Sequence, residues 1–131
     1  MQVLEQHVSR RREIHNLYTQ LLQDIEGVTV MQNPSSDFNS NFWLTTITFD
    51  DSWDTTPEEI RQALEAENIE TRWLWRPMHM QPVFANAPYY GGDCARNLFE
   101  HGLCLPSGSS LTDDDIHRVA DAIKDFFNKK K

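Results

Sequence analysis

The stretch RWLWRPMHMQP at residues 72–82 gathers two arginines, two tryptophans and one histidine, His79. Arginine supplies a planar set of N–H donors that suits a phosphate or a carboxylate, and tryptophan supplies a flat face on which a base or a sugar ring can stack. Histidine adds a donor or acceptor that titrates near neutral pH. Together these side chains are suited to a phosphorylated ligand that contains rings, or to a polar subunit interface.

The backbone of this stretch is expected to begin as a strand. Successive side chains of a strand point to opposite faces, so the two arginines would share one face and the two tryptophans the other. These residues are Arg72 and Arg76, and Trp73 and Trp75, respectively. This division does not give one simple core face and one simple solvent face. We expect one of the two tryptophans to belong to the core. Pro77 then ends the strand pairing, and an irregular segment follows.

Other groups of polar residues indicate less chemistry. The loose pair His101 and Cys104 is the best candidate for a metal site. A structural zinc site usually takes four ligands as two close pairs, so we expect a core cysteine and a surface histidine here and no metal. With Cys94 the chain has only two cysteines, which favours reduced, partly buried thiols and a cytoplasmic location. No spacing selects a nucleophile and its base, so no catalytic residue is named.

The composition fits one domain that spans residues 1–131. The chain has 39% hydrophobic and 24% charged residues, as is usual for a globular protein. Its net charge of −8 argues against a nucleic-acid partner, because such proteins carry basic surfaces. No apolar run approaches the roughly 20 residues that cross a membrane, so no membrane segment is expected.

Periodicity and turn residues predict four helices and four strands. Both later long helices begin with a capping pattern, TPEE at Thr56 and TDDD at Thr112. Helices are expected at residues 2–25, 56–68, 93–100 and from 112 onward, and strands at 28–32, 42–49, 69–75 and 103–106. This order predicts an α+β fold, with helices packed on a small mixed or antiparallel sheet.

Several motifs resemble the C-terminal end of the DegT/StrS family of nucleotide-sugar aminotransferases, which depend on pyridoxal phosphate (PLP). They are TPEEIRQALEAENIETRWLWRPMHMQPVF, YYGG, LFEHGLCLPSGSSLTDDDIHRVADAIKDFF and the leading RRREIHNLY helix. The likeness is greatest to members of the bacillosamine type, which act on UDP-linked 4-keto sugars. It implies the small C-terminal domain of a fold-type I enzyme, a homodimer with a large PLP-binding domain. Such an enzyme moves an amino group from a donor, expected to be glutamate, onto a keto sugar.

The resemblance also implies that residues 72–81 face the nucleotide-sugar cleft. The substrate-binding candidates that it gives are His79, Arg76, Trp75, Arg72, Gln81 and, in the SNFW segment, Asn41. Of these, His79 matches the family motif best and Asn41 least.

The chain has four lysines, Lys124, Lys129, Lys130 and Lys131, and none lies in a motif typical of a Schiff-base lysine. We therefore expect an isolated small domain that holds no cofactor and does not transaminate by itself. Its surface would expose residues that normally meet the missing domain, with Trp43, Trp73 and Phe84 as candidates. The alternative is a stand-alone module that binds a small ligand or a partner without catalysis.

Overall fold

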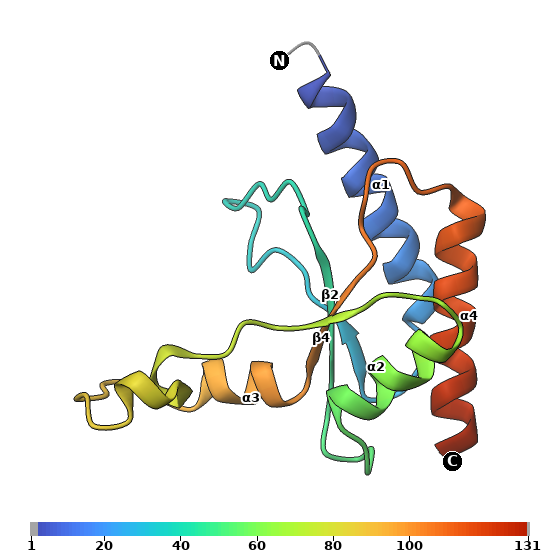
Figure 1. The fold of residues 1–131 in the computed structure, drawn as a ribbon. Coiled ribbons are helices and arrows are strands. Elements are labelled where there is room, and N and C mark those ends of the chain that lie inside the picture. The colour runs from blue at the N-terminus through green and yellow to red at the C-terminus, as the bar shows by residue number, and fades with distance from the viewer. Residues whose placement is uncertain (1–2, 131) are drawn as a thin grey trace.

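The computed structural model describes residues 3–130, which form an α+β domain (Figure 1). The helices are α1 (Leu4–Leu22), α2 (Pro57–Ala66), α3 (Cys94–Glu100) and α4 (Asp113–Lys130). The strands are β1 (Val28–Val30), β2 (Thr45–Phe49), β3 (Arg72–Trp73) and β4 (Gly102–Leu105). Two short 3-10 turns, Met78–Met80 and Pro82–Phe84, lie between β3 and α3.

The strands form one antiparallel sheet in the order β1-β2-β4-β3. In the centre of the sheet, Ile47 of β2 lies opposite Leu103 of β4. Residues alternate along β2 between buried and half-buried, while all four residues of β4 are buried. Of the two sheet types expected from the sequence, the antiparallel one is therefore present.

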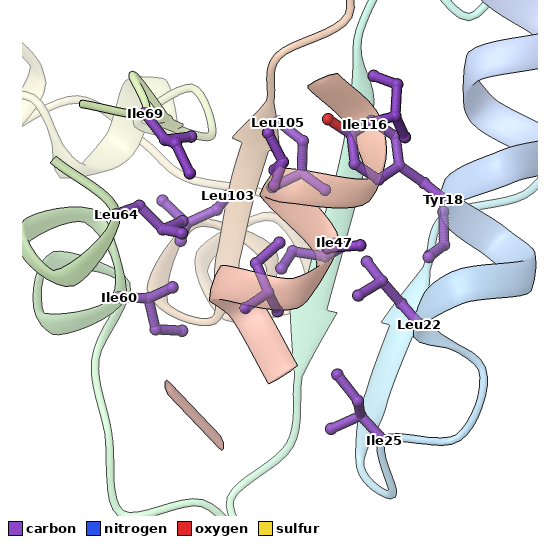
Figure 2. Packing of buried hydrophobic residues seen from close by; sticks show 14 of the residues in the cluster. Tyr18, Leu22, Ile25, Ile47, Ile60, Leu64, Ile69, Leu103, Leu105 and Ile116 are labelled. Atoms are coloured by element: carbon purple, nitrogen blue, oxygen red, sulfur yellow. The ribbon is translucent and has the colours of Figure 1, made fainter. Parts of the chain in front are cut away.

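The core lies between the sheet and a layer formed by α1, α4 and α2. Figure 2 shows α4 between α1 and α2, with Ile116 close to side chains from the strands. Tyr18, Ile47, Ile60 and Ile116 are completely inaccessible to solvent. Burying side chains of this size contributes about 1.5–3 kcal/mol each, so this cluster is the main source of the domain's stability.

Both expected capping boxes are present. At α2, Thr56 accepts a hydrogen bond from the Glu59 main-chain N–H, and the Glu59 carboxylate accepts one from the Thr56 N–H. At α4, Thr112 and Asp115 form the same reciprocal pair. Each box satisfies N–H groups that have no partner inside the helix, so the start of each helix is fixed locally.

Several expected elements are shorter than the sequence suggested. The strand expected at 42–49 begins at Thr45, because Phe42 has a positive φ of 44° and cannot continue the strand. The strand expected at 69–75 pairs only at Arg72 and Trp73, at the edge of the sheet. The first helix ends at Leu22 rather than at residue 25, and its expected start at residue 2 lies outside the described residues.

The chain between β3 and β4, residues 74–100, projects from the sheet and is called the arm (Figure 1). None of residues 72–101 is buried, although this range holds eight aromatic or histidine side chains. The expectation that one of the two tryptophans joins the core is wrong: Trp73 is 43% exposed and Trp75 is 65% exposed. Trp73 lies on the short edge strand and Trp75 beyond its end, so neither indole reaches the core.

Cys104 is buried in β4, whereas Cys94 is exposed at the start of α3, and both thiols are free. The expectation of partly buried thiols is therefore wrong for Cys94, because the arm that carries it lies outside the core. Among residues 3–130, no helix is both long and apolar enough to span a membrane.

Candidate functional site

Arg72 lies at the edge of the sheet, where it is paired with Cys104 of β4. Its guanidinium donates to the Glu70 carboxylate at 2.7 Å, and both side chains are exposed. Arg72 and Glu70 border a hollow of about 350 Å³ that Arg118 also lines. Burial raises the pKa of the Cys104 thiol in this hollow, with a smaller opposite effect from Arg72, so the thiol is protonated at neutral pH and is a poor nucleophile.

Phe99 of α3 holds the start of the arm in place. The Trp73 ring meets the Phe99 ring edge to face, with centroids 5.9 Å apart and an interplanar angle of 82°. The Arg76 guanidinium carbon lies 5.2 Å from the centroid of the same ring, a cation–π geometry. Phe99 therefore fixes both an indole and a guanidinium on the exposed side of the domain.

Trp75 meets a tryptophan from a distant part of the sequence. Its ring centroid lies 6.1 Å from that of Trp43, with the planes tilted by 42°. Trp43 is 57% exposed and sits just before β2, where its main-chain N–H donates to the Asn41 side chain at 3.0 Å. Asn41 and Trp75 are thus brought to the same region through Trp43.

His79 lies further along the arm, in the 3-10 turn after Pro77. Its ring packs against that of Tyr89 in a tilted arrangement, with centroids 4.0 Å apart and an interplanar angle of 34°. The two rings line a hollow of about 250 Å³ with Met78, Phe84 and Pro88. The His79 Nε2 atom is buried and has no hydrogen-bond partner among the described residues, which leaves a polar group available for a ligand.

Gln81 forms a hydrogen bond within the arm. Its amide nitrogen donates to the main-chain oxygen of Arg76 at 3.5 Å, a long hydrogen bond that links the two ends of the first 3-10 turn. Gln81 therefore contributes to the shape of this turn whether or not it contacts a ligand.

The six candidates thus form separate groups, and five of them lie on the surface formed by the arm and the loop before β2. Asn41 lies with Trp75, Arg76 with Gln81, and His79 with Tyr89. The guanidinium of Arg72 is instead bound to Glu70 and borders a different hollow.

Trp43 and Tyr89 belong to this surface, yet the sequence did not give them as site residues. In the strand expected at 42–49, Trp43 would share one face with Thr45, Ile47 and Phe49. The positive φ of Phe42 breaks that alternation. The clue in the sequence was the Ser-Asn-Phe-Trp order, since Ser and Asn often bond to the main chain two residues on.

Over the residues that the structure describes, no group of three or more His, Cys, Asp or Glu side chains could hold a metal ion. The His101 Nε2 atom lies 2.9 Å from the Asp51 carboxylate, away from Cys104. The loose pair noted in the sequence is therefore divided between a half-buried histidine beside Asp51 and a buried strand.

The fold is that of a part of the sugar aminotransferases. DesI, solved in the presence of its TDP-sugar product, superposes on 98% of this chain with a TM-score of 0.87 and 25% identity. The match covers 33% of the DesI chain.

The sequence identifies the family. Residues 1–124 match the DegT/DnrJ/EryC1/StrS aminotransferase family, and the chain belongs to it. EpsN of Bacillus subtilis (strain 168), provisionally named a pyridoxal phosphate-dependent aminotransferase, is 39% identical over 98% of this chain and 33% of its own length. GDP-perosamine synthase of Escherichia coli O157:H7 is 28% identical over 94% of this chain and 32% of its own length. The chain spans about a third of the length of these relatives.

The described lysines do not form a site for PLP, the cofactor that this family implies. Lys124, Lys129 and Lys130 all lie on α4. Lys130 bonds to the main chain of Asp54 and to Glu59, and Lys129 borders a hollow whose lining holds one arginine, Arg118, and four carboxylates, those of Glu67, Asp114, Asp121 and Asp125. A Schiff-base lysine needs a cofactor pocket, and a phosphate is repelled by carboxylates. These residues therefore do not fit the cofactor.

Proposed function

We propose that this chain is the small, substrate-side domain of a PLP-dependent aminotransferase that aminates a nucleotide-linked keto sugar. In this proposal the cofactor and its lysine belong to a separate, larger domain, and this domain supplies one wall of the substrate cleft. By itself it does not transaminate. The enzyme is proposed to be a homodimer that takes its amino group from an amino-acid donor.

The observation that carries the proposal is the arm. The arm, residues 74–100, contains no buried residue, and Trp75, Met78, Val83 and Tyr90 expose 60% or more of their surface. A domain of this size gains nothing in stability from holding so many large apolar groups in water. Their exposure is expected if the arm is covered by another domain and by substrate.

The chemistry of the arm supports a nucleotide-sugar ligand. Arg76 is fixed over Phe99 and can offer its N–H groups to a phosphate. The paired indoles of Trp43 and Trp75 offer apolar faces to a base or a sugar ring. The names of the relatives agree with this ligand class, because GDP-perosamine synthase and DesI both act on or form nucleotide-linked sugars.

A kinetic comparison tests the proposal in the aminotransferase that includes this sequence. We expect Arg76→Ala and His79→Ala to lower kcat/KM for the nucleotide sugar by about 10-fold or more, because each removes a charged or polar contact of ~1.4 kcal/mol or more. Arg96→Ala is the matched control, since Arg96 lies on the same arm but is paired with Asp93 at 3.6 Å. Unchanged kinetics in both site variants would remove the arm from the substrate cleft.

The absorbance of bound PLP tests whether the cofactor belongs to the separate, larger domain. The 131-residue chain mixed with PLP should show no cofactor band after dialysis, whereas the longer aminotransferase should retain one. A longer protein that retains no cofactor, or a gene that encodes only this domain, would favour the stand-alone binding module.

A further inference from the structure

Two side chains of α1, Arg12 and His15, hold the loop before β2, residues 39–43. Neither is one of the candidate site residues. Arg12 donates from Nε to the Ser40 main-chain oxygen at 3.0 Å and from Nη2 to the Asn39 side chain at 2.7 Å. One turn further along α1, the His15 ring lies on the Phe42 ring, with centroids 3.6 Å apart and planes 11° from parallel. Both contacts join segments about 27 residues apart in the sequence.

The hydrogen bonds around His15 fix its orientation. The Gln32 amide nitrogen donates to the Val30 main-chain oxygen at 3.2 Å, and a carbonyl can only accept. The Gln32 oxygen therefore faces His15 Nε2 at 3.2 Å, so Nε2 carries the ring proton. Thr19 also accepts from the Gln32 amide nitrogen, which holds this arrangement in place. The ring is thus oriented from one side by Gln32 and stacked from the other by Phe42.

The loop itself has a conformation that needs such support. Phe42 has a φ of 44°, in the left-handed region that is unfavourable for a residue with a large side chain. The Ser40 hydroxyl accepts from the Phe42 N–H, and the Asn41 side chain accepts from the Trp43 N–H, both at 3.0 Å. The turn aims Phe42 inward at His15 and leaves the next residue, Trp43, exposed beside Trp75.

We infer that Arg12 and His15 are positioning residues that place Asn41 and Trp43 in the nucleotide-sugar site. The inference rests on the proposed function of that site. Arg12 and His15 lie on α1 and contact the back of the loop, so they act through the loop and not on the substrate. Trp43 is then a specificity-determining residue, because its indole completes the aromatic pair with Trp75.

The indole N–H resonances of the 15N-labelled 131-residue chain test the placement of the loop. We expect His15→Ala and Arg12→Gln to shift the Trp43 and Trp75 indole signals. Trp53 is the internal control for the fold, because it packs on Phe127 and donates to the Glu26 main-chain oxygen.

Two further variants separate stacking from general damage. His15→Phe keeps a flat ring against Phe42 and should restore the Trp43 signal. Asn16→Ala, at an exposed position next to His15 on α1, should leave all four indole signals unchanged. If His15→Ala also displaces the Trp53 signal, that variant disturbs the whole fold. Arg12→Gln and His15→Phe then decide whether α1 positions Trp43. An unmoved Trp43 signal in both His15→Ala and Arg12→Gln would overturn the inference.

Kinetics of the longer aminotransferase complete the test. His15→Ala should raise KM for the nucleotide sugar by about 10-fold with a smaller change in kcat, and His15→Phe should recover most of the loss. If Trp43 moves in the labelled chain while KM stays the same, α1 places the loop but the loop is outside the site, and the assignment of Asn41 and Trp43 is wrong. If Arg76→Ala and His79→Ala are also without effect, the proposed function itself fails.

Discussion

His15 is the buried side chain of this domain whose charge state matters most near neutral pH. It is completely inaccessible to solvent, and its Nδ1 atom has no partner among the described residues. Burial lowers the pKa of His15 below the ordinary 6.5, and the hydrogen bond with Gln32 opposes this effect only in part. The ring is therefore neutral in the folded protein at pH 7, which is the state that stacks well on Phe42.

The lowered pKa of His15 predicts how stability depends on pH. The unfolded chain binds a proton at His15 near pH 6.5, whereas the folded chain resists it, so the free energy of unfolding should fall as the pH drops below 6.5. Each unit of difference between the two pKa values corresponds to about 1.4 kcal/mol. Urea unfolding of wild type and His15→Phe between pH 7.5 and 5.5 measures this effect, and the variant should show a smaller decrease.

Four carboxylates with a lowered pKa contribute little to the change in the free energy of unfolding between pH 7.5 and 5.5. Hydrogen bonds lower the pKa of Asp50, Glu59 and Asp115, and Arg61 with Gln62 lowers the pKa of Glu58 to about 2. Lowered carboxylate pKa values stabilise the fold above about pH 4 and lose their effect only as the pH falls below it. Equal pH slopes in wild type and His15→Phe would show that His15 is not the responsible group.

At the scale of elements, the arm is joined to the sheet at a point of close approach. Gly102, the first residue of β4, lies against α3 and the start of the arm. A Cβ added at Gly102 would lie 2.5 Å from the Leu98 main-chain oxygen and would overlap the Leu74 side chain. Glycine therefore allows α3 and residue 74 to approach β4 together, and this approach places Trp73 and Arg76 around Phe99.

Gly102→Ala should displace the arm. A backbone atom cannot rotate away as a side chain can, so we expect a loss of about 1–3 kcal/mol in the free energy of unfolding. The Trp73 and Trp75 indole signals should shift while the Trp53 signal stays. Gly108→Ala is the control, because its added Cβ would meet only the Ser110 hydroxyl at 3.7 Å. A variant with native stability and native Trp73 signals would contradict the close approach.

At the scale of the whole molecule, the domain combines a well-packed core with an apolar surface outside it. The core joins α1, α2 and α4 to the sheet (Figure 2). Trp43, Trp73 and Phe84, the residues expected to be exposed, are indeed 57%, 43% and 36% exposed. The net charge of −8 opposes association of two copies, but salt screens that repulsion.

The 131-residue chain is therefore expected to self-associate through the arm, more strongly at high salt. Replacing Trp75 and Tyr90 by Gln should reduce the association without lowering stability, because these side chains are 65% and 91% exposed. Leu4→Gln is the matched control, since Leu4 is 58% exposed on α1, outside the arm. Sedimentation velocity over a range of concentrations measures the effect. Equal association of both variants and wild type would place the contact elsewhere.

Local signals in the sequence were enough to predict the helices and the fold class. The capping patterns at Thr56 and Thr112 and the apolar spacing of α4 depend on residues a few positions apart, so they could be read directly. The central strands β2 and β4 also follow from their apolar residues. The α+β class and the family resemblance came from these features together.

The tertiary structure alone decided what surrounds the candidate site. Whether Trp73 and Trp75 are buried depends on where the edge strand stops, and their own alternation does not contain that information. The pairs Trp43–Trp75, His79–Tyr89 and His15–Phe42 join residues that only the fold brings together. Contacts between distant segments depend on the packing of the whole chain, so RWLWRPMHMQP could indicate the kind of ligand but not the partners that position these side chains.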